Sequence, residues 1–316
     1  MSKFDKDFDF EELTFHCRSP IFMCAECKHA VRCQDLLNLL RLYSFEEKKA
    51  APDYSDAFPF IKPRPENAIP DRNNKLNALT SSEWLRFTRT VVSDILPRTH
   101  GHDLRRRHPD YKNHFLMGQL IAFFTKPGQL VLDPFAGTGS ALTAASLLGR
   151  DAVGFELHKK WIDIYYEICA KAGVDKQKLV QGDAVHLSRY LPPESVDFVI
   201  VDPPNVTRPE EWMGPEGGAE AASDAYFTMI EELLLNCRKA LSAKKYLALF
   251  ARNLYQQGSY IFLTPHFAAA AENAGFVIKG EKIWENKGEK LRPYGYPSSY
   301  VPNIVHYTIL IFQKKK

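Results

Sequence analysis

The feature that most constrains this chain is a short apolar run at residues 129–133, followed at once by a glycine turn and a helix-forming stretch. Such a short, bounded run is typical of a buried strand in a parallel sheet. Gly137 and Gly139 permit a tight turn and let a ligand approach the backbone closely. Residues 140–148 are rich in Ala, Ser and Leu and predict a helix. A strand, a glycine turn and a helix in this order form a nucleotide-binding unit.

Acidic residues mark the ends of three successive predicted strands. The strands are expected at residues 129–133, 151–156 and 178–181. Asp133 and Glu156 end the first two strands, and Asp183 follows the third. Glu156 lies about 20 residues beyond the glycines, where an acid accepts hydrogen bonds from ribose hydroxyls, and Asp183 could meet the amino group of an adenine. Leu142 replaces the third small residue of the dinucleotide fingerprint, which disfavours NAD. The alternative is an α/β domain whose glycines serve only as turn residues.

Strand-like and helix-like segments alternate to the end of the chain. This alternation predicts an α/β fold with a Rossmann-like, doubly wound and mostly parallel sheet. The final apolar run, at 305–312, has no helix between it and a near neighbour, so we expect it to enter the sheet antiparallel. Upstream, Thr80 carries a capping signal for a helix at 81–95. Other helices are expected at 117–125, 223–242 and 260–274, with a strand at 246–250.

A second motif, Asp202-Pro203-Pro204, follows a strand-like run at 198–201. Two prolines cannot continue a sheet ladder and keep the backbone extended, so the turn can aim a carboxylate and carbonyl oxygens at one point. Such a turn is suited to hold an amino group. An exocyclic amine needs this help, because its lone pair is delocalised into the ring and it is a poor nucleophile. Acceptors for its hydrogens let the nitrogen pyramidalise towards a methyl donor in near-attack geometry. The strands before the two motifs are neighbours in a doubly wound sheet, so both motifs are expected at one edge.

Together these two motifs resemble the DNA methylase family, whose members use S-adenosylmethionine to methylate cytosine N4 or adenine N6. The likeness covers roughly residues 70–316 and includes 74–89, 123–140 and 293–312. The order of the motifs fits one of the family's permuted arrangements. The resemblance implies S-adenosylmethionine as cofactor, DNA as substrate with the target base flipped out of a duplex, and a cognate restriction endonuclease as a partner. The implied cofactor-binding residues are Asp133, Phe135, Gly137, Gly139, Glu156 and Asp183, and the implied catalytic residues are Asp202, Pro203, Pro204 and Asn205.

The resemblance departs from the family pattern at Asn205, where the family carries an aromatic residue that stacks on the flipped base. Stacking is worth ~1–3 kcal/mol per base in single-strand binders, so Asn205 implies weaker catalysis, a substitute ring or an inactive site. The candidate substitute rings are those of Trp212, Tyr294, Tyr296 and Tyr300. Asp202 in the first place of the motif favours adenine, whereas the overall likeness includes cytosine enzymes, so the target base stays open.

Two other functions stay open beside the leading one. The first is a methyltransferase that acts on RNA guanine or on protein amides, since such enzymes use similar Pro-Pro turns. The second is a catalytically impaired DNA-binding subunit, which Asn205 favours. The intact cofactor residues favour an enzyme, because an inactive copy has no reason to keep carboxylates for a cofactor.

Four of the six cysteines fall close together near the start of the chain. They are Cys17, Cys24, Cys27 and Cys33. In a reducing compartment such clustering favours a metal site over disulfides, and the spacing of Cys24 and Cys27 is typical of half a tetrahedral thiolate site. We predict zinc ahead of an iron–sulfur cluster, which four thiolates also suit. The alternative is four small buried residues in a helical segment. Cys169 and Cys237 lie in helical patterns and are expected in the core.

The chain of 316 residues is expected to have three segments. These are a Cys-rich segment with a possible metal site at 1–50, an extended linker rich in Pro, Asp and Asn at 51–75, and a methyltransferase domain at 76–316. A net charge of +3 argues little for nucleic acid, but the densely basic stretch at 98–108 predicts either a phosphate-contacting patch or a solvated loop. The charge-interrupted start predicts no signal peptide, and no apolar run approaches the ~20 residues of a membrane span. We therefore expect a cytoplasmic protein with no membrane partner.

Overall fold

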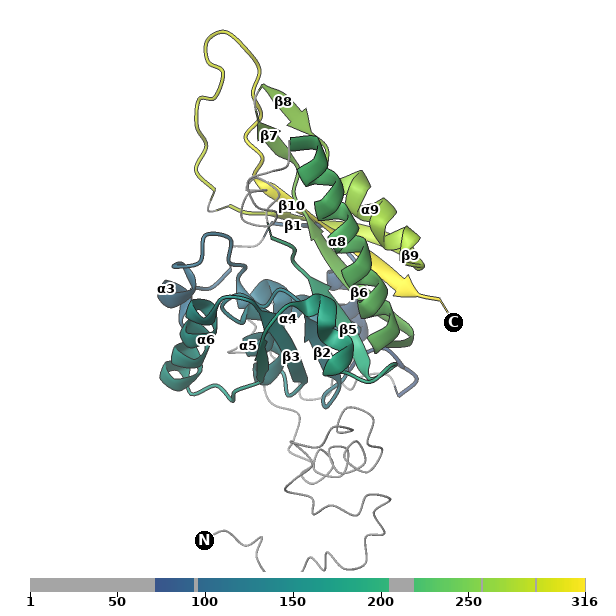
Figure 1. Ribbon diagram of the computed structural model, residues 1–316. Coiled ribbons are helices and arrows are strands. Elements are labelled where there is room, and N and C mark those ends of the chain that lie inside the picture. The colour runs from purple at the N-terminus through teal and green to yellow at the C-terminus, as the bar shows by residue number, and fades with distance from the viewer. Residues whose placement is uncertain (1–71, 94–95, 205–218, 257, 288, 316) are drawn as a thin grey trace, which may run out of the picture. The chain divides into compact units, whose positions relative to one another are not determined.

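The computed structural model describes residues 72–93, 96–204, 219–256, 258–287 and 289–315 (Figure 1). The chain divides into two compact units, Met1–Ala51 and Pro52–Lys316, and every described residue belongs to the second. The Cys-rich segment and most of the extended linker lie outside the described residues, so the three predicted segments stay predictions.

The described unit is built on an eight-stranded sheet (Figure 1). In spatial order its strands are β1 (Val91–Val92), β9 (Phe276–Glu285), β10 (His306–Lys314), β6 (Leu241–Ala251), β5 (Val196–Val201), β2 (Leu130–Asp133), β3 (Asp151–Glu156) and β4 (Lys178–Gln181). Strand β10 runs antiparallel to β6 and β9, and every other pair in this sheet is parallel. The predicted Rossmann-like, mostly parallel sheet with an antiparallel final strand is therefore confirmed.

Helices cover both faces of the sheet and bury a separate apolar layer on each. One layer contains α4 (His114–Phe124), α5 (Ser140–Leu147) and α6 (Lys159–Ala172), and the other contains the 3₁₀ helix η4 (Ala184–Arg189), α8 (Ala219–Ala240) and α9 (Thr264–Asn273). Strand β5 serves both layers, since Phe198 and Ile200 face the first and Val199 and Val201 face the second. Burial on both faces explains why residues 198–201 of this strand form a continuous apolar run in the sequence.

The helix predicted at 81–95 is shorter in the structure. Helix α2 spans Ser81–Phe87 and begins at Thr80 with the expected capping box, but it ends at Thr88. The prediction of a longer helix was wrong because Val91 and Val92, which are β-branched, pair with the sheet edge as β1. The ammonium of Lys282 on β9 donates to the carbonyls of Phe87 and Arg89, which fixes this helix end.

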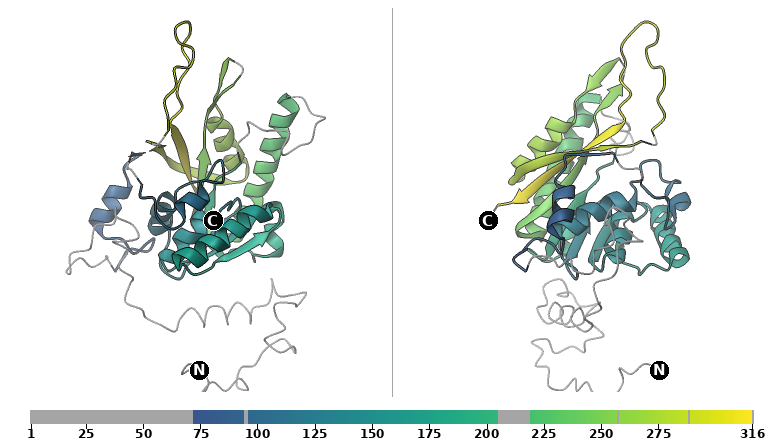
Figure 2. Two further views of the ribbon diagram at one scale, coloured as in Figure 1. Left: turned by 90° about the vertical axis from the view of Figure 1, so that its left-hand side faces the viewer. Right: turned by 180° about the vertical axis from the view of Figure 1, so that it is seen from behind.

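Two projections extend from the same end of the sheet (Figures 1 and 2). The hairpin arm, residues 254–263, contains β7 (Leu254–Gln256) and β8 (Ser259–Ile261), which pair antiparallel. The loop arm, residues 286–305, connects β9 to β10 and is closed at its base by a hydrogen bond from the Asn286 amide to the Val305 carbonyl. The predicted helix at 260–274 was therefore too long at its start, because β8 takes up its first residues and α9 begins at Thr264.

Candidate active site

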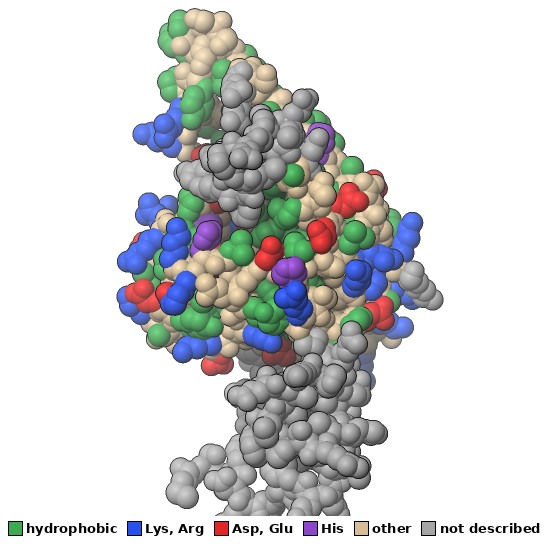
Figure 3. All heavy atoms as spheres, viewed as in Figure 1, with side chains coloured by type: hydrophobic (Ala, Val, Ile, Leu, Met, Phe, Trp, Pro, Cys, Tyr) green, Lys and Arg blue, Asp and Glu red, His purple; other side chains and the backbone are tan. Residues whose placement is uncertain are grey.

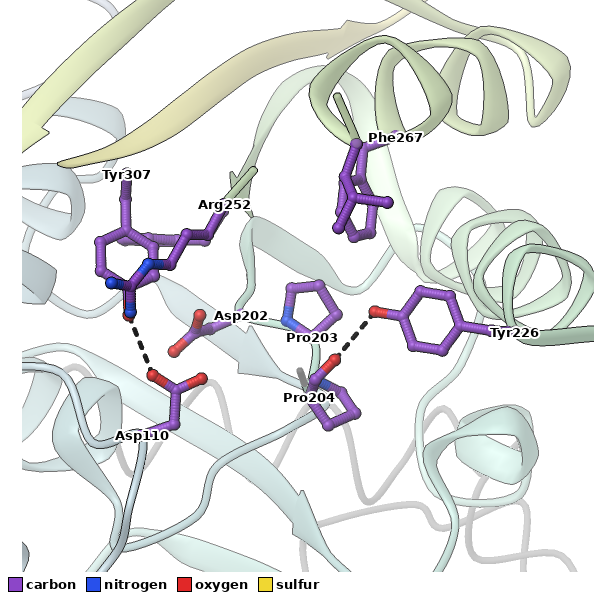
Figure 4. A pocket seen from close by; sticks show the side chains of 10 residues that line it. Asp110, Asp202, Pro203, Pro204, Tyr226, Arg252, Phe267 and Tyr307 are labelled. Atoms are coloured by element: carbon purple, nitrogen blue, oxygen red, sulfur yellow. Dashed lines mark hydrogen bonds between the residues drawn. The ribbon is translucent and has the colours of Figure 1, made fainter. Parts of the chain in front are cut away.

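A pocket opens at the carboxyl edge of the sheet, where the Asp-Pro-Pro turn leaves β5 (Figure 4). Its polar lining comes from Asp202, from Asp110 in the segment before α4, and from Arg252 just after β6. Its rings are those of Tyr226, Phe250, Phe267 and Tyr307. The pocket therefore combines aromatic walls with carboxylates, which suits a flat ring that carries hydrogen-bond donors.

The two prolines of the turn are held by helix α8. The hydroxyl of Tyr226 donates to the Pro204 carbonyl at 2.9 Å, and the Tyr226 side chain is buried (Figure 4). This bond fixes the end of the turn, so the direction of Asp202 does not depend on the prolines alone. One of the carbonyl oxygens predicted to hold a target amine is thus already an acceptor for the protein's own hydroxyl.

Burial sets the electrostatics of Asp202. The pKa of its carboxyl group is raised to about 6, mainly by desolvation and also by the nearby Asp110 carboxylate, while Lys112 acts in the opposite direction. The Nζ of Lys112 lies 3.1 Å from Asp202 Oδ2 and 3.1 Å from Asp110 Oδ1. Asp202 therefore belongs to an ion-paired cluster. Lys112 lies at the centre of this cluster, although neither sequence motif indicated it.

The cluster extends to strand β10. The hydroxyl of Tyr307 donates to Asp110 Oδ1 at 3.0 Å, and Arg252 donates to the Tyr307 hydroxyl oxygen at 3.2 Å and to the Ile304 carbonyl at 3.0 Å. The Lys112 ammonium lies 4.4 Å from the centre of the Tyr307 ring. Sequence reasoning missed these residues because they stand alone in three distant segments and form no motif.

The glycine turn lies beside this pocket, since β2 pairs with β5. The Gly137 amide donates to Glu156 Oε2 at 3.1 Å, and the His158 amide donates to the other oxygen of Glu156 at 2.7 Å. Gly137 has φ +51°, and a Cβ placed on it would meet only His108, at 3.6 Å. The acid at the end of β3 thus orients the turn while its remaining lone pairs stay available for hydroxyl donors.

Gly139 also packs against a neighbouring helix. It also has positive φ, at +70°, but a Cβ there would lie 2.1 Å from the Tyr165 ring of α6. The packing of α5 against α6 therefore requires a glycine here, whether or not a ligand binds at the turn. The same region holds Arg105, which is buried and donates to the Thr138 carbonyl at 2.6 Å and to Thr143 Oγ1 at 2.6 Å.

The basic stretch at 98–108 is accordingly divided in the structure. Arg105 points inward, whereas Arg98, Arg106 and Arg107 are exposed. In the space-filling view, Lys and Arg side chains gather around α3 (His102–Arg105) and α6 (Figure 3). The exposed part of the stretch keeps the predicted phosphate-contacting role as a hypothesis.

The carboxyl group of Asp133 is buried at the end of β2. Its pKa is raised to about 8, mainly by desolvation and also by the Asp202 and Glu156 carboxylates, while the Phe135 amide that donates to it at 3.0 Å acts in the opposite direction. A buried carboxyl group ionises readily only when a positive charge lies beside it. The sulfonium and ammonium groups of S-adenosylmethionine would supply one, so the residues present fit this cofactor. Asp183 caps η4 by accepting the Val185 amide at 2.9 Å, and its predicted contact with adenine remains a prediction.

Three of the four predicted substitute rings do not line the pocket. Tyr294, Tyr296 and Tyr300 lie on the loop arm and are 52%, 83% and 86% exposed. Asn205 and Trp212 lie outside the described residues. The rings that do line the pocket come from α8, β6, α9 and β10, and spacing along the chain gave no sign of them.

The predicted metal site, with Cys17, Cys24, Cys27 and Cys33, also lies outside the described residues. Within the described part of the chain, no group of three or more His, Cys, Asp or Glu side chains is arranged to hold a metal ion. Cys169 and Cys237 are buried free thiols, as predicted. Nor does any helix of the described part have the length and apolar character needed to cross a membrane.

Comparison with known proteins agrees with the motifs. Residues 23–167 match the DNA methylase family, which confirms the resemblance to this family. The match begins upstream of residue 70, where the resemblance was expected to start, and it ends before the Asp202-Pro203-Pro204 turn. A tRNA (guanine(6)-N2)-methyltransferase of Thermus thermophilus is 36% identical over 86 residues, which cover 26% of this chain and 25% of that protein. The type II methyltransferases M.MthZI of Methanothermobacter thermautotrophicus and M.HinfI of Haemophilus influenzae are 32% and 38% identical, over 26% and 19% of this chain and 23% and 17% of their own lengths. The chain thus spans at most a quarter of the length of these curated relatives.

Proposed function

We propose that this protein, which resembles the DNA methylase family over residues 23–167, transfers a methyl group from S-adenosylmethionine to the exocyclic amino group of adenine (N6) or cytosine (N4) in DNA. One observation carries the proposal: the glycine turn after β2 and the Asp202-Pro203-Pro204 turn after β5 end neighbouring parallel strands. A methyl donor at the first turn and an amine at the second would meet at one edge of the sheet.

The acceptor half of the site is suited to an amine. The Asp202 carboxylate would accept a hydrogen of the target NH₂ group, which lets the nitrogen lone pair turn away from the ring and towards the methyl group. Transfer would form the new N–C bond as the methyl–sulfur bond of the donor breaks, and Asp202 would take up the proton that the nitrogen loses. Neither a covalent nucleophile nor a metal ion is required by this step.

The donor half of the site would hold the cofactor. When bound, S-adenosylmethionine supplies a methyl group activated by its positive sulfur. We expect Asp133 to pair with the cationic end, Gly137 and Gly139 to form the turn beneath it, and Glu156 to accept from the ribose hydroxyls. Phe135 would wall the same side, and Asp183 would meet the adenine amino group. The raised pKa of Asp133 and the orientation of Gly137 by Glu156 support this assignment.

The surface around the pocket supports a nucleic acid as the substrate. Seven of the fourteen exposed large apolar side chains of the described residues lie on the two arms, and Lys287, Lys290 and Arg292 are exposed on the loop arm. Both arms are anchored at the pocket. The hairpin arm leaves just after Arg252, and Arg252 donates to the carbonyl of Ile304, next to the last residue of the loop arm. Aromatic side chains interleaved with cations suit unstacked bases and phosphates.

A second substrate class is favoured by one comparison. The matched Thermus relative is named a tRNA (guanine(6)-N2)-methyltransferase, so an exocyclic amine of RNA is the competing target. The type II names of the other two relatives favour DNA and, with it, a cognate restriction endonuclease as a partner in the cytoplasm. An impaired DNA-binding subunit remains the alternative that Asn205 raises.

Transfer of labelled methyl groups tests the proposal. We expect purified protein to label duplex or single-stranded DNA, and mass spectrometry of the digested nucleosides to identify N6-methyladenine or N4-methylcytosine. Asp202→Ala should abolish transfer while calorimetry shows nearly unchanged S-adenosylmethionine affinity, since that carboxylate faces the target amine. Label found in tRNA alone would replace DNA with RNA. Intact cofactor binding with no label in any nucleic acid would leave the impaired subunit as the better account.

A further inference from the structure

We propose that Lys112 is a positioning residue for Asp202: its ammonium keeps the Asp202 carboxylate ionised and aimed at the target amine, and its main chain ties that carboxylate to the cofactor-binding helix α5. The inference rests on the proposed function, because it takes Asp202 as the acceptor of the amine. Lys112 belongs to neither motif and lies in the segment between α3 and α4.

The side chain of Lys112 is committed to two carboxylates. It is only 2% exposed, its Nζ lies 3.1 Å from both Asp110 Oδ1 and Asp202 Oδ2, and it stands over the Tyr307 ring. Placing an ammonium in a buried site is costly unless opposite charges surround it. The arrangement is thus an ion triad around a buried lysine, with its two carboxylates half-buried.

Charge balance shows why the cation is needed. The charged or titratable groups around Asp202 come from five elements and segments. They are Asp110 and Lys112 before α4, Asp133 at the end of β2, Tyr226 on α8, Arg252 after β6 and Tyr307 on β10. Without Lys112, Asp110 and Asp202 would be two half-buried carboxylates with no cation between them, and one of them would take up a proton at neutral pH. A protonated Asp202 would accept the amine's hydrogen less well.

The main chain of Lys112 extends the argument to the cofactor side. Its carbonyl accepts from Ser140 Oγ at 2.6 Å, and Ser140 is the first residue of α5 after the glycine turn. One residue therefore contacts the acceptor acid through its side chain and the cofactor helix through its backbone. Methyl transfer needs reacting atoms about 3–3.5 Å apart, and such a link would hold the two halves of the site in register.

Lys112 does not act as the base itself. Burial alone lowers the pKa of its ammonium, but Asp202, Tyr307 and Asp110 together raise it well above its usual range. The side chain therefore stays protonated and cannot take the proton that the amine loses. Its effect passes through Asp202.

The test measures the titration of Asp202 directly. Protein labelled with ¹³C in its aspartate carboxyl groups would be titrated by NMR, with Asp202→Asn used to assign the signal. We expect Lys112→Met to raise the pKa of Asp202 and Asp110→Asn to lower it, because the first removes a cation and the second an anion. Two substitutions that merely loosened the fold would not move the pKa in opposite directions.

Activity gives the second readout. We expect Lys112→Met to lower kcat for methyl transfer at pH 7 by about 100-fold, the order of loss that misplaced reacting groups cause. The KM for S-adenosylmethionine should change little, kcat should recover partly at higher pH, and Lys112→Arg should restore part of the loss. Lys282→Met is the matched control, since Lys282 is also a buried lysine but bonds only backbone carbonyls at the end of α2.

The outcomes separate the two proposals. Wild-type activity in Lys112→Met, or an Asp202 titration that shifts in neither variant, would overturn the role of Lys112 while leaving the proposed function intact. Opposite shifts in the titration, with no methyl transfer by wild-type protein to any nucleic acid, would support the triad and refute the function. Equal damage in Lys112→Met and Lys282→Met would show that only stability was lost.

Discussion

Gly137 and Gly139 are separated by one residue, and their surroundings differ. Both have positive φ, but a Cβ on Gly139 would overlap the Tyr165 ring at 2.1 Å, whereas a Cβ on Gly137 would meet only the His108 ring at 3.6 Å. We expect Gly139→Ala to destabilise the fold by about 3 kcal/mol, from overpacking added to left-handed strain. Urea unfolding, followed by circular dichroism, measures the difference.

Gly137→Ala is the matched substitution. It carries the same backbone strain without the overlap, so we expect a loss of only about 1–2 kcal/mol in the free energy of unfolding. Its greater effect should be on cofactor binding, because the added methyl group stands on the turn beside Glu156. Equal destabilisation by the two substitutions would contradict the assignment of Gly139 to packing against α6.

We expect Asp133 to release a proton when the cofactor binds. Burial raises its pKa to about 8, so below that pH the free protein holds the acid mostly neutral. A cationic ligand favours the ionised form, so binding should release a proton. With a pKa near 8, apparent affinity for S-adenosylmethionine should rise about tenfold between pH 6 and pH 7 and level off above pH 8. Calorimetry in buffers of different ionisation enthalpy counts the released protons.

The control for this linkage is Asp133→Asn, which keeps the shape of the side chain but cannot ionise. It should bind S-adenosylmethionine more weakly, with neither the proton release nor the slope between pH 6 and pH 7. Affinity that stays flat with pH in the wild type would rule out an ion pair between Asp133 and the cofactor.

At this scale the sequence predicted the residues that belong to motifs. Asp133, Glu156 and Asp202 follow apolar runs directly, and strand ends fix their position. Lys112 and Arg105 could not be found in this way, because a single basic residue in a polar stretch looks the same whether it is solvated or buried. Only the three-dimensional placement of Asp110 and Asp202 around Lys112 distinguishes the two cases.

Among the elements, the loop arm offers the sharpest test of how substrate is held. Tyr296 and Tyr300 are its most exposed rings, and no apolar layer accounts for them. If they stack on bases, the double substitution Tyr296→Ser and Tyr300→Ser should weaken DNA binding at least tenfold, at ~1–3 kcal/mol per stacked base. Fluorescence anisotropy with labelled DNA measures this, and S-adenosylmethionine affinity should not change.

Two leucines provide a matched pair for the same element. Leu291 on the loop arm is 69% exposed and Leu85 on α2 is 72% exposed, so Leu→Ser has the same chemistry at both positions. We expect Leu291→Ser to reduce DNA affinity and Leu85→Ser to leave it unchanged. Equal effects would mean that exposed apolar area in general, and not the loop arm, governs binding.

The sequence predicted the positions of those strands and helices whose boundaries are set by the burial of apolar residues. Strands β3 and β4 have the predicted ends, and α5 differs by one residue. The prediction of a helix at 81–95 was wrong beyond Phe87, because its later residues pair with β9. Val91 pairs with Ile283, 192 positions later in the chain, and Lys282 of the same strand also holds the helix end. Local capping and periodicity predict where a helix starts, but tertiary pairing decided where this one stops.

At the scale of the whole molecule, the order of strands brought the two motifs together. Sequence spacing predicted a doubly wound sheet, and the pairing of β2 with β5 follows from that topology. The rings of the pocket could not be predicted, because they come from α8, β6, α9 and β10, whose loops differ in length and carry no fingerprint. Topology thus predicts where a site lies, and side-chain packing from distant segments decides what fits it.

The last prediction concerns the Cys-rich segment, which precedes the described domain. Cys17, Cys24, Cys27 and Cys33 are expected to bind about one zinc ion per chain, because four thiolates satisfy a tetrahedral site. Elemental analysis of purified protein should find the metal, and substituting Cys24 and Cys27 by Ser should remove it and destabilise the segment, since structural zinc supplies folding energy. Cys169→Ala, at a buried thiol of the domain, is the control and should retain the zinc. Iron and sulfide in place of zinc would indicate a cluster, and protein free of both metals would leave these cysteines without a metal-binding role.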